Sequence, residues 1–94
     1  MRVRWLRRAL LDLEKAEAYI AQDDPNAAAG VIVRIVRAVS LLKEQPGIGR
    51  AGRVSGTKEL VVPKTPYIVP YRVKDDAVHI LRVYHTSRKW PDSM

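Results

Sequence analysis

Two histidines, His79 and His85, are the side chains of this sequence that exchange protons near neutral pH, and they lie six residues apart near the C-terminus. If that segment is a strand, both point to one face of a sheet. No carboxylates converge on them, so a metal site is not expected. The chain has no cysteine, which excludes a thiolate nucleophile and a cysteine-bound zinc ion. We expect neither a metal nor another cofactor.

Positive charge is concentrated in the same half of the chain. The formal net charge is +7; residues 45–94 hold nine Lys or Arg against four Asp or Glu, and residues 1–44 hold eight against six. Three strand-like runs between residues 47 and 90 carry most of this excess, which predicts a basic sheet surface. Its partner should be an anion, either a nucleic acid or an acidic protein.

Three glycines, Gly47, Gly49 and Gly52, match the dinucleotide-binding spacing G-x-G-x-x-G. That motif requires a strand before it and a helix after it, and here the order is reversed. We therefore interpret the segment as a flexible loop between a helix and a strand. Arg50 and Arg53 in this loop are either solvated charges or the rim of an anion-binding surface.

Apolar residues recur at intervals of three and four in the first half of the chain, which predicts two amphipathic helices. Asp24 and Pro25 form a helix start between them, and Pro46 with Gly47 ends the second helix. A short turn makes the pair a helical hairpin. The first apolar face comprises Leu6, Ala9, Leu10, Leu13, Ala16 and Ile20, with Arg7, Arg8, Asp12 and Lys15 facing water, and the second comprises Ala28, Ile32, Ile35, Val39 and Leu42.

Strands are expected at both ends of the chain. Residues 2–5 alternate polar and apolar, and strand-like runs follow near 58–62, 67–73 and 78–84. Pro70 cannot donate to a ladder, so the middle of its strand should carry a bulge or an unpaired position. The order β-α-α-β-β-β predicts a single α+β domain over residues 1–94, with the helical hairpin on one face of an antiparallel sheet and the other face partly open.

The amino-acid sequences of these elements, in this order, resemble those of the ParE/RelE superfamily. Members of this superfamily are toxins of type II toxin–antitoxin modules, and plasmid stabilisation toxins are among them. The resemblance covers nearly the whole chain, and its strength lies in the order of the elements. They are the Trp5 opening, the alanine-rich hairpin with Asp24-Pro25, the Pro46-Gly47-x-Gly49-Arg50 link, the run from Gly52 to Val62, the run from Pro66 to Val73, and Ile80 to His85 with Arg88 behind.

The resemblance implies a growth-inhibiting toxin that a cognate acidic antitoxin neutralises within a hetero-oligomeric complex. Free toxins of the ParE type inhibit DNA gyrase, and those of the RelE type cut messenger RNA on the ribosome. The fold does not choose between them. Ile68 stands where RNA-cutting relatives carry a phosphate-binding arginine, and Val83 stands where some carry another. This favours a gyrase inhibitor that is not an enzyme.

The alternative is a metal-independent endoribonuclease with His85 as acid or base, assisted by Arg82, Arg72 or Lys64. A third possibility is a degenerate toxin that only binds its antitoxin. The residues expected to contact the target or the antitoxin are Arg50, Arg53, Lys58, Arg82, His85, Arg88 and Trp90.

Several of these residues also have structural interpretations. Lys58 and Lys64 are typical of edge-strand charges that discourage aggregation. Arg82 is as easily a buried stem paired with Glu59 as a substrate contact. Trp5 and Trp90 are expected to anchor the packing at the two ends. With no signal-peptide run and no stretch near 18 apolar residues, we expect a cytoplasmic protein without a membrane partner.

Overall fold

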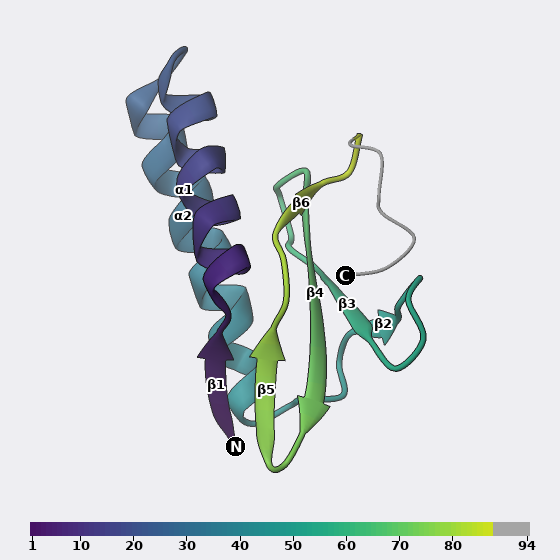
Figure 1. Ribbon diagram of the computed structural model, residues 1–94. Helices are drawn as coiled ribbons and strands as arrows, with labels where there is room; N and C mark the ends of the chain where they lie inside the picture. Colours follow the sequence, from purple (N-terminus) through teal and green to yellow (C-terminus); the bar gives the residue numbers. More distant parts are fainter. Residues whose placement is uncertain (88–94) are drawn as a thin grey trace.

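The helical hairpin and the start of the second helix agree with the sequence pattern. In the computed structural model, which describes residues 1–87, helices α1 (Arg7–Ala21) and α2 (Pro25–Ser40) run side by side (Figure 1). Asp24 precedes α2, and its Oδ1 accepts the N–H groups of Asn26 at 3.0 Å and Ala27 at 3.2 Å. Pro25 fills the first helical position, where no N–H donor is needed.

The sheet is mixed and has six strands in the order β1-β5-β4-β3-β2, with β6 paired to the other end of β4. The first strand, β1, is parallel to β5, and every other pairing is antiparallel. A two-residue strand, β2, was not predicted. The bounds are β1 Arg2–Trp5, β2 Arg50–Ala51, β3 Lys58–Val61, β4 Tyr67–Lys74, β5 Ala77–Ile80 and β6 Tyr84–His85, and a short 3₁₀ turn, η1, covers Leu41–Lys43.

The predicted last strand is divided in two. Pairing with β4 stops after Ile80, where the N–H of Leu81 donates to the carbonyl of Pro70 at 3.0 Å, and it resumes at Tyr84. Pro70 has no N–H to offer on that side, so the facing chain loses nothing by leaving the ladder there. The segment Leu81–Val83 turns toward α1 instead.

Both helices pack on one face of the sheet, and the other face carries no helix (Figure 1). The fully buried side chains between the layers include Ile35, Val39 and Leu42 from the helical side and Tyr71, Val78 and Ile80 from the sheet. Trp5 packs partly buried against this core, as expected. The predicted α+β architecture is therefore confirmed, with the parallel β1 added to an otherwise antiparallel sheet.

The buried stripe of α1 differs from the prediction. It is centred on Ala9, Asp12 and Ala16, whereas Leu10, expected inside, is 46% exposed. The two alanines let α1 lie close to its neighbours. Asp12 was expected to face water but is buried, because Arg82, in the segment after β5, forms an ion pair with it.

The segment Pro25–Lys43, which is α2 continued through η1, is long and apolar enough by length and composition to cross a membrane. No stretch of this kind was predicted from the amino-acid sequence. Its Ile35, Val39 and Leu42 are fully buried against the sheet, so we interpret it as a core helix of the folded domain.

Candidate functional site

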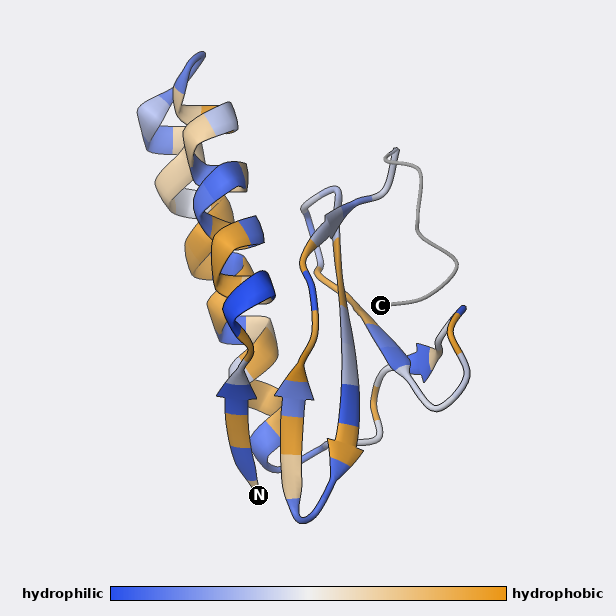
Figure 2. Cartoon of the chain, in the orientation of Figure 1, coloured by the Kyte–Doolittle hydropathy of each residue, from blue (hydrophilic) through white to orange (hydrophobic). Residues whose placement is uncertain are grey.

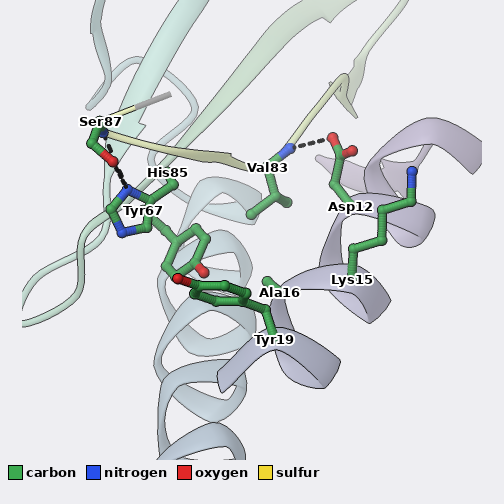
Figure 3. Close-up of a pocket in the computed structure, with 8 residues that line it drawn as sticks. All are labelled: Asp12, Lys15, Ala16, Tyr19, Tyr67, Val83, His85 and Ser87. Carbon is green, nitrogen blue, oxygen red and sulfur yellow. Dashed lines mark hydrogen bonds between the residues drawn. The ribbon is translucent and has the colours of Figure 1, made fainter. Parts of the chain in front are cut away.

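A recess opens between α1 and the far end of the sheet, where β6 pairs with β4 (Figure 3). Its volume is about 390 Å³, within the usual range of ligand pockets. Aromatic and polar side chains face one another across it. The lining residues are Asp12, Lys15, Ala16 and Tyr19 from α1, and Tyr67, Val83, His85 and Ser87 from the sheet side.

His85 lies in this recess with a defined orientation. Its Nδ1 lies 3.1 Å from the backbone N of Ser87 and 2.8 Å from the Ser87 hydroxyl oxygen, and its ring meets Tyr67 edge-on at 5.3 Å (Figure 3). A backbone N–H can only donate, so Nδ1 acts as the acceptor. The neutral ring therefore carries its proton on Nε2, which is the nitrogen left to bind a partner or to transfer a proton.

One side of the recess is formed by Asp12, which makes an ion pair that joins α1 to the segment after β5. Both oxygens of the Asp12 carboxylate accept from Arg82, at 2.7 and 3.1 Å, and one also accepts the backbone N–H of Val83 at 3.0 Å. The hydrogen bond to Asp12 raises the pKa of Arg82 above its ordinary value, and burial opposes this. The guanidinium also lies 4.8 Å from the centre of the Tyr84 ring.

Arg82 is therefore held as a structural cation. The expectation that it pairs with Glu59 was wrong: its partner is Asp12. The pair fixes Leu81–Val83, the segment that leaves the ladder, onto α1. This places Val83 and His85 at the recess.

Arg50 and Arg53 gather around a different carboxylate. Glu59 on β3 is 1% exposed; its Oε1 accepts from Arg50 Nε at 3.2 Å and Nη2 at 3.1 Å, and its Oε2 accepts the backbone N–H of Arg53 at 2.8 Å. The Arg53 side chain is 3.9 Å away. These two arginines therefore compensate a buried charge, which neither of the two sequence interpretations included.

The other predicted site residues do not gather at the recess. Arg72 is five residues after Tyr67 on β4, so it lies on the face opposite to His85. His79 is paired with Arg72, so the expectation that the two histidines share one face was wrong: the chain leaves the ladder between them. Lys64 is exposed in the turn between β3 and β4, with a backbone φ of 62°. Lys58 begins β3, opposite Tyr71. Arg88 and Trp90 lie outside the described residues.

Sequence reasoning missed the α1 side of the recess. Lys15 and Tyr19 were not predicted as site residues, and Ser87 was not considered. The signal for Asp12 was its position three residues after Ala9 and four before Ala16, which places it inside the buried stripe. Within residues 1–87, no group of three or more His, Cys, Asp or Glu side chains could hold a metal ion.

Comparison with known proteins gives consistent matches. Residues 3–90 match the family described as the ParE toxin of the type II toxin-antitoxin system parDE. A Sinorhizobium fredii protein, Y4kP, is 51% identical over 90 residues, covering 96% of this chain and 93% of its own. Toxin RelE2 of Caulobacter vibrioides is 39% identical over 84 residues, covering 89% and 93%.

Two solved structures share the fold. A chain of the chromosomal ParDE toxin–antitoxin system of P. aeruginosa has a TM-score of 0.82 at 31% identity, covering 90% of this chain and 95% of that one. A chain of the RelBE2 toxin–antitoxin complex of Mycobacterium tuberculosis has a TM-score of 0.58 at 29% identity, covering 89% and 88%.

These matches define the class as the toxin of a type II toxin–antitoxin module with the ParE/RelE fold. Within that class, the chain belongs to the ParE toxin family. Both solved neighbours are toxin–antitoxin systems, which supports an antitoxin as a partner of this protein.

Proposed function

We propose that this toxin acts in the cytoplasm by inhibiting DNA gyrase through protein contact, without catalytic residues of its own. One observation carries the proposal: among residues 1–87, the cations predicted to assist His85, namely Arg82, Arg72 and Lys64, do not gather around it. Arg82 is bound by Asp12, and Arg72 lies on the opposite face of the sheet. Metal-free RNA cleavage needs cations around the phosphate as well as an acid and a base.

A supercoiling assay tests this proposal. Purified toxin, freed of antitoxin, is titrated into gyrase with relaxed plasmid, and the same preparation is added to ribosomes programmed with messenger RNA. We expect supercoiling to stop while the message stays intact. Normal supercoiling at a large excess of folded toxin would refute the proposal.

We further propose that a cognate antitoxin places an acidic, amphipathic segment in the recess. Tyr19 is 69% exposed at its rim and offers apolar area, while Lys15 and the Nε2–H of His85 offer donors to a carboxylate. Aromatic side chains of this kind often dominate binding energy, and charge mainly accelerates association.

Two measurements test the antitoxin site. Tyr19→Ala should raise the rate at which the antitoxin dissociates roughly 10- to 100-fold, as expected for an aromatic anchor. Val33→Ala on the exposed side of α2 is the matched control and should leave the rate within twofold. Raising salt should slow association more than it speeds dissociation. Equal effects of the two substitutions would place the antitoxin elsewhere.

The second candidate is a ribosome-dependent mRNA interferase, and one observation favours it: His85 shares the recess with Lys15. If His85 is a general acid or base, His85→Ala should reduce message cleavage about 10²- to 10⁴-fold. His79→Ala is the control, because His79 lies on the opposite face of the sheet, across from Arg72. Full toxicity of the His85 variant would exclude this candidate.

A further inference from the structure

The helix-free face of the sheet carries a group of cations that the proposed function does not use. On β1, Arg2 and Arg4 alternate with Val3, which packs against the core, and Figure 2 shows this alternation as blue and orange bands. Arg72 and Lys74 have the same spacing on β4. We refer to these four residues, Arg2, Arg4, Arg72 and Lys74, as the basic strip.

The strand register brings the strip together from both ends of the chain. Arg4 lies opposite His79 of β5, which lies opposite Arg72 of β4, and Arg2 and Lys74 flank Ala77 in the same way. Residues opposite one another share a face, so all four cations point away from the helices. Across the three strands they span about 10 Å, and along each strand they are about 7 Å apart.

Among residues 1–87, none of the strip cations forms an ion pair. The three ion pairs of this region join Glu59 to Arg50 and Arg53, and Asp12 to Arg82. A shallow hollow of about 280 Å³ lies on the strip, lined by Leu6, Arg72, Lys74, Asp75, His79 and Leu81. Asp75 is the acidic residue of this hollow, and it lies in the turn at its end.

Protection of a sheet edge explains only part of the strip. Charges on an edge strand prevent pairing with other chains, and β1 is such a strand. Arg72, however, lies two strands further in, beside β5, which is paired on both sides. Four cations on one face of a sheet repel one another, so a partner with opposite charge is a direct explanation for the grouping.

We propose that the basic strip binds the phosphate backbone of duplex DNA. Clustered arginine and lysine side chains are typical of phosphate contacts. The strip has none of the Tyr, Trp or Phe side chains that are enriched in protein interfaces. Single-stranded nucleic acids bind on exposed aromatic platforms. The lining of the hollow includes the imidazole of His79 but no Phe, Tyr or Trp. The register places Trp5, Tyr67 and Tyr71 on the helix side of the sheet. This inference does not depend on the target proposed above.

Salt dependence of DNA binding measures the number of contacts. With four phosphate contacts, the logarithm of the binding constant should fall with log salt at a slope of about −3.6, so raising salt from 50 to 200 mM should weaken binding roughly 150-fold. The assay uses fluorescence anisotropy of a labelled 20-base-pair duplex and the full-length, antitoxin-free toxin.

A pair of double variants separates the strip from overall charge. Arg4→Gln combined with Arg72→Gln removes two phosphate contacts, so the slope should become shallower, about −1.8. The same salt step should then weaken binding only about 12-fold. Arg34→Gln with Arg37→Gln removes the same charge from exposed positions of α2 and should leave the slope unchanged. If the first pair fails to fold by circular dichroism, Arg2→Gln with Lys74→Gln is used instead.

Several results would overturn the proposal. These are the absence of duplex binding at 50 mM salt, an equal loss from both double variants, tighter binding of a single-stranded oligonucleotide than of the duplex, and displacement of the duplex by polyglutamate at equal charge. Because DNA binding is measured without gyrase, its failure is distinct from failure of the supercoiling test.

Discussion

Removing the carboxylate of Asp12 tests how the recess is built. The Asp12 side chain is 5% exposed and that of Arg82 is 21% exposed, and the carboxylate accepts three hydrogen bonds, two from Arg82 and one from Val83. Breaking a buried ion pair from one side typically costs about 3–5 kcal/mol. Because Arg82 keeps some contact with water, we expect Asp12→Ala to cost about 3 kcal/mol, the lower end of that range.

That loss would be a large share of the total. A domain of this size has a free energy of unfolding of about 5–14 kcal/mol. With a urea m-value of about 1.5 kcal/mol per molar, the midpoint should fall by about 2 M. Urea titrations followed by circular dichroism at 222 nm measure this change. Glu14→Ala, an exposed acidic residue on the same helix, is the control and should change stability by less than about 0.5 kcal/mol.

A double-mutant cycle completes the test. Once Asp12 is absent, Arg82→Ala should cost little more, so the two changes together should destabilise by clearly less than their sum, with a coupling of about 1–3 kcal/mol. A loss below about 1 kcal/mol for Asp12→Ala, or a coupling near zero, would show that the ion pair does not hold Leu81–Val83 on α1.

Three further predictions concern the link between the helices and the sheet. Glu59→Gln should destabilise the fold by about 2 kcal/mol because Arg50 loses its charged partner, and thermal melting measures the loss. Gly49→Ala should cost about 1–3 kcal/mol, since its Cβ would lie 2.6 Å from the Tyr71 hydroxyl, whereas Gly47→Ala meets nothing within 4 Å and should be neutral. Burial raises the pKa of the Tyr71 hydroxyl above its ordinary value of 10.0, because burial disfavours the charged form. The folded state therefore loses stability when this hydroxyl loses its proton: the contribution is fully present below about pH 10 and disappears as the pH rises through the pKa of the folded state. Tyr71→Phe should therefore lose less stability than the native chain between pH 9 and 11.5 in urea titrations, and an identical loss in both would contradict this.

Local signals in the sequence were enough for the helical hairpin. Its apolar periodicity and the Asp24 cap depend only on residues a few positions apart, so they can be interpreted without knowing the fold. Asp12 shows where this stops. Its side chain is polar on a helical wheel, and its partner Arg82 is 70 residues away, so only the packed structure shows that it lies inside.

The sequence pointed to one residue of the recess but not to the residues that surround it. His85 was identified from its chemistry, but the recess around it depends on how α1 packs on β6, which brings Lys15 and Tyr19 to the same space. Arg50 and Arg53 look like free cations in the sequence. A glutamate in a strand normally faces water, so the sequence did not indicate that Glu59 is buried between them. Pro70 correctly marked an irregular point on β4, but the sequence did not show that the neighbouring chain would break there.

The pairing of β1 with β5 has a consequence during protein synthesis. Residues 2–5 pair with residues 77–80, so the first strand has no partner until about 75 further residues have been made. At about 5–20 residues per second, a ribosome needs roughly 4–15 s to add them. The nascent sheet therefore lacks its first strand for that time, and the recess, whose His85 comes later in the chain than β5, can form only afterwards.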